Sequence, residues 1–175
     1  MKSIKLAAPL TLEKVNALAA GDMVELSGTI YTGRDAAHKR LCQLLEENKP
    51  LPVELRDQMI YFVGPCPAPP GRPIGSAGPT TSGRMDAYSP VLIEKCGLRG
   101  MIGKGDRDAG VKEAMKKYGA VYFAATGGAG ALIARSIVAA KVIAFPDLGP
   151  EAIYELEVKD LPLVVAIDAK GNSLY

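Results

Sequence analysis

The stretch AVYFAATGGAGALIARSIVAAKVIAF, residues 120–145, decides the fold that the sequence predicts. Its first seven residues are mostly apolar and do not alternate with polar ones, which is typical of a strand buried on both faces. GGAGALIARSI then predicts a closely packed helix of small residues, and VAAKVIAF predicts a second strand. A strand–helix–strand unit of this kind indicates an α/β domain.

Working outward, the same alternation recurs along the chain. Strands are predicted over residues 3–9, 22–33, 58–64 and 99–105, and helices over residues 11–20, 34–49, 85–97 and 108–119. Gly28 predicts a bulge in its strand. Residues 152–168 predict two further strands, one on each side of Leu161–Pro162, so that paired strands close the chain. We therefore expect a single α/β domain over residues 1–175 with a mixed sheet.

Composition excludes several classes of protein. With 175 residues, 48% of them hydrophobic, the chain can bury a real core. A net charge of +2 without a long basic run disfavours nucleic-acid binding by phosphate neutralisation. The best candidate for a membrane span, residues 129–145, is interrupted by Arg135 and Lys141. The apolar part of the N-terminus is too short for a secretory signal, so we expect a cytoplasmic protein.

The three cysteines do not form a disulfide framework in this prediction. Cys42, Cys66 and Cys96 are odd in number, widely separated and without a CxxC spacing, which fits a reducing compartment. Three thiolates could ligate an iron–sulfur cluster, but such ligands usually include a closely spaced pair on a loop. Buried or half-buried free thiols are therefore favoured.

A long loop rich in proline and glycine, PCPAPPGRPIGSAGPTTSGR, occupies residues 65–84. It is too constrained for a flexible linker and too long for an ordinary connection, and loops of this kind are disproportionately functional. Its end, GPTTSGRMD, carries two threonines, Ser82 and Arg84 on a turn that leads into a predicted helix. The turn holds no strong general base and no nucleophile with a partner beside it.

Two more glycine-bearing junctions between a strand and a helix carry a cation, namely TGRD with Arg34 and GKGDRD with Lys104. Helix starts present free N–H groups and partial positive charge, and an arginine fork matches a carboxylate. If the three junctions converge, they form a pocket for a small molecule with more than one carboxylate. Taken singly, each junction has an ordinary explanation: an arginine paired with Asp35 or Asp86, and hydroxyls that cap a helix.

A nucleotide site is the competing interpretation. The strand and glycine-rich helix start at residues 120–134, with Asp147 about 20 residues beyond, partly match a dinucleotide fingerprint. Ile133 stands where the third glycine belongs, so close packing of a small-residue helix is favoured. No GxxxxGK[ST] phosphate loop occurs. The only histidine, His38, lies one helical turn after Arg34 and could orient Arg34 or a ligand, or be a structural polar residue.

Together, GPTTSGRMD, GRDAAH, GMIGKGD and DLGPEAIYELEV closely resemble the C-terminal domain of class I iron–sulfur fumarases, which is a separate β subunit in many prokaryotes. The β subunit of L-tartrate dehydratase is similar too, although RMD looks more like the fumarases. The likeness runs through essentially the whole chain. It implies a swivelling β/β/α domain and a hydro-lyase that interconverts (S)-malate and fumarate.

The resemblance also implies a partner and a cofactor. A [4Fe-4S] cluster would be held by three cysteines of an α subunit, in a heterodimer or heterotetramer, and no metal would be bound by this chain. Isolated, the chain could form homodimers. No nucleic acid or membrane is expected as a partner.

The family's carboxylate-binding and catalytic positions fall on Arg34, Thr80, Arg84 and Lys104, and each has the expected residue type. The candidate catalytic residues are Thr80 and Lys104; the candidate substrate-binding residues are Arg34, Arg84, Thr81 and His38. The resemblance points to Thr80 as the base. A threonine hydroxyl is a poor base, so Lys104, an amine that would be desolvated near two arginines, is the alternative.

Other functions stay open at this stage. Tartrate or a methyl-substituted fumarate such as mesaconate would suit the same cations as malate or fumarate. A non-catalytic anion-binding or regulatory module is a different class of function that the same turns could serve.

Overall fold

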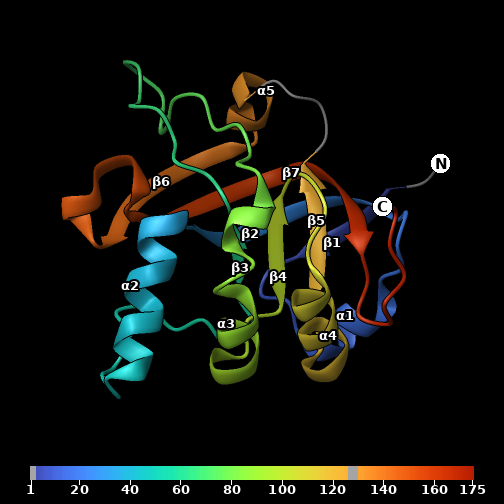
Figure 1. Cartoon of the computed structure of the whole chain (residues 1–175). Coiled ribbons are helices and arrows are strands. Elements are labelled where there is room, and N and C mark those ends of the chain that lie inside the picture. The colour runs from blue at the N-terminus through green and yellow to red at the C-terminus, as the bar shows by residue number, and fades with distance from the viewer. Residues whose placement is uncertain (1–2, 126–129) are drawn as a thin grey trace.

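A mixed sheet organises the part of the chain that the structure, a computed structural model, describes, namely residues 3–125 and 130–175. Five neighbouring strands are parallel: β1 (Ile4–Ala7), β2 (Met23–Thr32), β3 (Met59–Tyr61), β4 (Gly100–Gly103) and β5 (Val121–Ala125). The long β7 (Ile153–Ile167) runs antiparallel to both β2 and β5, and β6 (Ile137–Ala144) runs antiparallel to β7. The predicted α/β class and mixed sheet are confirmed (Figure 1).

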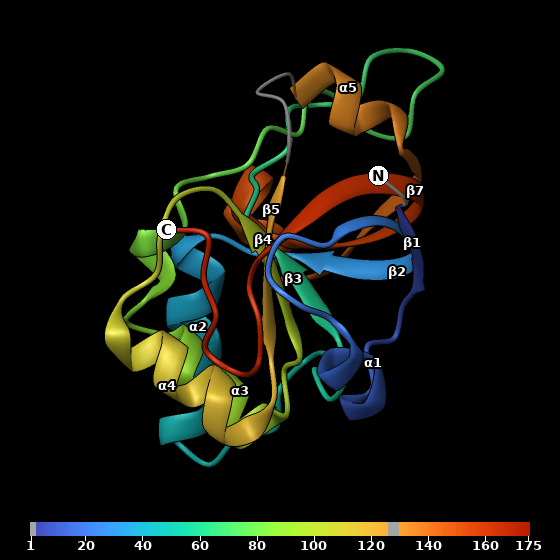
Figure 2. The ribbon, with the colours of Figure 1, turned by 90° about the vertical axis from the view of Figure 1, so that its right-hand side faces the viewer.

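The elements lie in layers. Because β7 pairs with β2 and also with β5, the sheet folds back on itself. Figure 2 shows the resulting order: helices on one side, β3, β4 and β5 in the middle, and β1, β2 and β7 on the other side. The helices of the first layer are α2 (Asp35–Glu46), α3 (Ser89–Cys96) and α4 (Ala109–Tyr118), while α1 (Leu12–Ala17) and α5 (Gly130–Arg135) lie near opposite ends of the molecule.

Successive side chains of the central strands point to opposite faces and fill the two spaces between the layers. On β3, Met59 and Tyr61 belong to one apolar cluster and Ile60 to a second. On β5, Phe123 joins the first cluster and Tyr122 the second. The middle strands are therefore buried on both faces, which explains why their sequences are almost continuously apolar.

The prediction of two strands within residues 152–168 was wrong, because β7 is continuous through Pro162. Pro162 lies opposite Glu25 of β2. In this part of β7, however, the N–H groups of alternate residues point toward β2. Val165 is one of them, and its N–H donates to the Asp22 carbonyl. The nitrogen of Pro162 therefore points to the other edge, between the parts of β7 that pair with β6 and with β5. A strand tolerates proline where no ladder hydrogen bond is lost. The bulge predicted at Gly28 is confirmed by a register shift between β2 and β7.

The helix predicted over residues 85–97 begins later, at Ser89, and follows a short 3₁₀ turn, η1 (Ser82–Met85). Pro90 explains the late start, since proline is accepted only in the first turn of a helix. Another 3₁₀ segment, η2 (Pro146–Glu151), joins β6 to β7. The part of the predicted small-residue helix at residues 127–129 lies outside the described residues. No helix within the described residues combines the length and apolarity needed to cross a membrane.

Candidate active site

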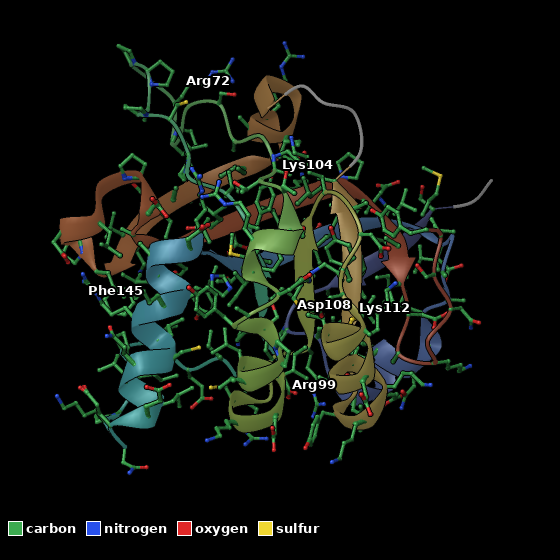
Figure 3. All side chains as sticks on the ribbon, viewed as in Figure 1. Arg72, Arg99, Lys104, Asp108, Lys112 and Phe145 are labelled. Carbon is green, nitrogen blue, oxygen red and sulfur yellow. The ribbon has the colours of Figure 1, made fainter. Side chains whose placement is uncertain are left out.

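The predicted junctions lie at one edge of the sheet, where the parallel strands end. Arg34 follows β2, Gly64 follows β3, and Lys104 follows β4; residues 80–84 join them from the long loop, and we call these residues the rim. Figure 3 shows Lys104 beyond one end of β4, with Arg99 at the opposite end. The carboxyl ends of parallel strands are where α/β sheets usually bind ligands.

Arg34 stands at the start of α2, with its side chain against the backbone of Gly64. A Cβ atom at position 64 would lie 3.0 Å from Arg34 Cδ and 3.1 Å from one of its terminal nitrogens. Glycine at this position therefore gives the guanidinium room beside the end of β3. From the other side of the helix start, Glu151 of η2 accepts a hydrogen bond from Ala36 N at 3.3 Å.

His38 is fully buried beneath Arg34. Its Nδ1 lies 2.8 Å from the Arg34 carbonyl oxygen, and because that oxygen can only accept, Nδ1 carries the proton. Burial, helped by the nearby charge of Arg107, lowers the pKa of His38 to about 4, so the ring is neutral at pH 7. His38 therefore reaches the rim only through Arg34, and the prediction that it binds substrate stays untested.

The turn at residues 80–84 is fixed by backbone hydrogen bonds to two strand ends. Thr80 N donates to the Phe62 carbonyl at 2.7 Å, and Ser82 N donates to the Lys104 carbonyl at 2.9 Å. Thr81, which is exposed, forms an isolated parallel bridge with Lys104. The second and third predicted junctions are thus in direct contact.

Buried hydroxyls strengthen that contact. The Tyr122 hydroxyl lies 2.7 Å from Ser82 Oγ and 2.7 Å from the Gly105 carbonyl oxygen. Since a carbonyl can only accept, Tyr122 donates to Gly105 and Ser82 donates to Tyr122. Burial of Tyr122 raises the pKa of its hydroxyl, which keeps it protonated as a donor. Ser82 is therefore buried in the base of the turn rather than presented to a ligand.

An ion pair joins the first and second junctions. Arg84 Nε and a terminal nitrogen of its guanidinium lie 3.0 and 2.8 Å from Asp35 Oδ2. Asp35 immediately follows Arg34, so the pair places Arg84 beside the start of α2. Both side chains are partly exposed, so the pair contributes little to stability. Asp35 is one of the two carboxylates that the sequence offered as an ordinary partner for an arginine. The Arg84–Asp35 pair forms even though the junctions also lie close together.

Lys104 and Thr80 complete the set of candidate residues. The Lys104 side chain is exposed, and within residues 3–125 and 130–175 its ammonium forms no salt bridge. Thr80 is half-buried at the start of the same turn. The roles of all six candidate residues stay predictions, but the geometry brings Arg34, Arg84 and Lys104 to one rim.

All the buried side-chain polar atoms that lack a hydrogen-bond partner within the described residues belong to the N-cap residue and the first turn of α2. They are Arg34 Nε, Asp35 Oδ1 and His38 Nε2. Buried polar groups are normally paired, so three such atoms in one turn mark a place where further polar contacts are expected. This observation, absent from the sequence pattern, singles out the α2 start.

Arg107 is a buried charge that the sequence pattern did not single out. Its side chain is fully buried and donates from Nε to Asp86 Oδ1 at 2.7 Å. The guanidinium also lies 5.1 and 5.0 Å from the ring centres of Phe62 and Tyr122. In the sequence it is one charge among several in GKGDRD, and nothing in that pattern distinguishes a buried arginine from an exposed one.

The described residues do not fit a metal cluster. They contain no group of three His, Cys, Asp or Glu side chains placed to hold a metal ion. Cys66 is exposed on the long loop, while Cys42 and Cys96 are half-buried on α2 and α3. Burial raises the pKa of both half-buried thiols, which disfavours the thiolate form that metals require.

A hollow of about 570 Å³ lies away from the rim. It is lined by the end of α2, residues 49–56 and the end of α3, near the amino-terminal ends of β3 and β4. None of the six candidate residues lines it. Of the candidate residues, Thr81, Arg84 and Lys104 are exposed.

Comparison with known proteins places this fold and rim in a family. The family model described as "Fumarase C-terminus" matches residues 1–175, and the chain belongs to that family. It is 42% identical over 153 residues to "Fumarate hydratase class I, anaerobic" of Escherichia coli (strain K12), covering 87% of this chain and 28% of that protein. It is 40% identical over 176 residues to "Putative fumarate hydratase class I" of Geobacillus stearothermophilus, covering 98% and 33%.

A shorter relative has a different name. The chain is 40% identical over 171 residues to "Putative L(+)-tartrate dehydratase subunit beta" of Methanocaldococcus jannaschii, covering 95% of this chain and 88% of that protein. The chain therefore spans about a third or less of the two fumarate hydratases named above, and most of this shorter relative. The resemblance to class I fumarases and to tartrate dehydratase β subunits is confirmed.

Proposed function

We propose that this chain is the β subunit of a two-subunit iron–sulfur fumarate hydratase that reversibly dehydrates (S)-malate to fumarate. Family membership and the fumarate hydratase relatives support the reaction class. The relative named as a beta subunit, to which this chain is 40% identical, supports action together with a separate chain. The exposure of Arg84 and Lys104 at the rim is compatible with a partner chain that completes the site.

The observation that carries the proposal is the meeting of Arg34, Arg84 and Lys104 at the ends of β2 and β4, linked by the Arg84–Asp35 pair and the Ser82–Lys104 hydrogen bond. Malate and fumarate carry two carboxylates, and arginine forks bind carboxylates bidentately. Removal of a proton next to a carboxylate moves negative charge onto that group, and preorganised cations stabilise it. These residues would hold and polarise the substrate.

Thr80 and Lys104 are the candidates for proton transfer. Thr80 stands at the start of the turn, and its backbone N–H donates to the Phe62 carbonyl. This hydrogen bond fixes the backbone that carries the Thr80 hydroxyl. Lys104 is exposed on this chain, so the desolvation that would make its amine a base has to come from substrate and partner. We assign the proton transfer to Thr80, with Lys104 as the alternative.

The remaining parts of the proposal concern the assembly. The partner would be an α subunit that carries a [4Fe-4S] cluster, which would supply a Lewis acid for the departing hydroxyl. We also propose that residues 1–175 form one domain of the swivelling β/β/α type, which the layers of Figure 2 support. A cytoplasmic location would suit the free cysteines.

A tartrate dehydratase is the second candidate, favoured by the Methanocaldococcus relative. Tartrate has the same two carboxylates as malate with one more hydroxyl, so the same cations would bind it. The choice between the two substrates would depend on contacts to that hydroxyl.

The test is anaerobic co-expression with the partner chain and assay of malate, fumarate and tartrate. We expect dehydration of malate by the complex, and none by this chain alone. Thr80→Ala should abolish turnover while leaving malate binding measurable, and Arg84→Lys should lower kcat/KM by at least about 100-fold, since an ammonium cannot reproduce the fork. Arg56→Lys, an exposed arginine away from the rim, is the matched control.

Preferential turnover of tartrate would select the second candidate. A complex that is fully loaded with its cluster and dehydrates none of these acids would refute the proposal. Near-normal turnover by Thr80→Ala would remove Thr80 from the mechanism.

A further inference from the structure

We infer that Arg107 is a positioning residue, which holds the turn carrying Thr80 and Arg84 in register with the turn carrying Lys104. The geometric part of this inference stands on the structure alone, and its consequence for catalysis rests on the proposed function. Arg107 itself lies in the core, where it cannot touch a ligand at the rim.

The contact between the two turns has two ends. At the first end, Ser82 N donates to the Lys104 carbonyl, and Tyr122 connects Ser82 to Gly105. At the second end, both carboxylate oxygens of Asp86 are bound by the loop after β4: Oδ1 by Arg107 Nε at 2.7 Å and Oδ2 by Asp108 N at 3.0 Å. Arg84 lies between these two fixed points.

Arg107 also connects the turn to the helix that follows it. One of its terminal nitrogens donates to Ser89 Oγ at 2.7 Å, and the Ser89 hydroxyl donates to the Met85 carbonyl at 3.1 Å. The other terminal nitrogen lies 3.2 Å from Met101 Sδ on β4. One planar group thus connects the end of η1, the start of α3 and Met101 of β4.

Only an arginine can make these contacts together. Its guanidinium lies near the rings of Phe62 and Tyr122, which favours a flat cation. A lysine would carry the charge but would lack the fork, and replacement of a buried ion pair by apolar groups of similar volume is often neutral or stabilising. A charged group retained in the core therefore indicates a requirement for position.

The consequence concerns Arg84. Only Met85 separates it from Asp86, so a shift at Asp86 moves the backbone that carries the Arg84 fork away from Asp35. A displacement of about 1 Å in a positioning group lowers a catalytic rate by about 100-fold. Loss of the Arg107 contacts should therefore appear as a loss of kcat per folded site.

The test compares Arg107→Lys and Asp86→Asn with Met115→Ala, which shortens a buried apolar side chain on α4 in the same core and removes no ion pair. In the complex, with rates corrected for folded and cluster-loaded sites, we expect kcat to fall about 10- to 100-fold for the first two variants. Met115→Ala should stay within about twofold of the parent. A purely structural role would leave kcat per folded site unchanged in all three.

A second readout does not depend on activity or on a partner. In ¹⁵N NMR spectra of the chain alone, the Nε–H signal of Arg84, identified by its loss in Arg84→Lys, reports the hydrogen bond to Asp35. We expect this signal to shift and exchange faster with water in Arg107→Lys and Asp86→Asn, but not in Met115→Ala. An unchanged Arg84 signal in both folded variants would overturn the inference. If the parent complex has no dehydratase activity but the signal responds as expected, the proposed function fails and the positioning role stands.

Discussion

Replacement of Gly103 by alanine is expected to lower the free energy of unfolding by about 2–4 kcal/mol. A Cβ atom at this position would lie 1.9 Å from Ser82 Oγ and 2.9 Å from Phe62 Cδ2. Rotation of the Ser82 hydroxyl relieves the first overlap but breaks the hydrogen bond to Tyr122, at a cost of about 1 kcal/mol. The Phe62 ring must still move within a packed core, which costs about 1–3 kcal/mol more.

Urea unfolding of the parent, Gly103→Ala, Ser82→Ala and the double variant measures these contributions. Ser82→Ala should cost about 1 kcal/mol in the parent and almost nothing in Gly103→Ala, because the hydrogen bond is already broken there. Gly110→Ala is the matched control, since its Cβ would meet only Asp108 Oδ1 at 3.5 Å, an ordinary contact. A cost below about 0.5 kcal/mol for Gly103→Ala, or an equal cost of Ser82→Ala in both backgrounds, would refute the reasoning.

Two further predictions concern titrating groups. Unfolded His38 titrates near 6.5 and folded His38 near a pKa of about 4, so the unfolded state takes up the proton first as the pH falls. Stability should therefore drop by about 2 kcal/mol between about pH 7.5 and pH 5 in the parent. His38→Gln should abolish that component in urea unfolding at the two pH values, and an identical pH dependence would contradict the assignment. Alkylation near neutral pH, followed by peptide mass spectrometry, should modify the exposed Cys66 at least about tenfold faster than Cys42 or Cys96, whose thiol pKa values burial raises. Equal rates at all three would show that the two half-buried thiols open readily.

Local patterns were sufficient for most of the fold. Apolar runs such as MIYFV predict buried strands because both faces of a central strand meet apolar neighbours, as Met59 and Ile60 do here. Capping residues act within a few residues of a helix end. Thr11, which caps the start of α1, and Gly97, which caps the end of α3, can therefore be recognised from the sequence. The glycine-bearing junctions fall at strand ends for the same local reasons.

Contacts between distant residues could not be predicted in this way. Periodicity shows that β7 is a strand, but not that it pairs with β2 and β5 at once and so passes unbroken through Pro162. The sequence offered Asp35 and Asp86 equally as arginine partners, whereas the fold gives Asp35 to Arg84 and Asp86 to the buried Arg107. Which charge is buried depends on the packing of three layers, and no spacing along the chain encodes it.

The double pairing of β7 has a consequence for biosynthesis. Its residues come last among the strands, yet they pair with β2, more than 100 residues earlier in the chain. During translation, the edges of β2 and β5 that pair with β7 therefore stay unpaired until residues 153–167 have left the ribosome, and such edges invite association with other nascent chains. Sheet closure is thus a late event in the life of each new molecule, and chaperones that shield strand edges should raise its yield.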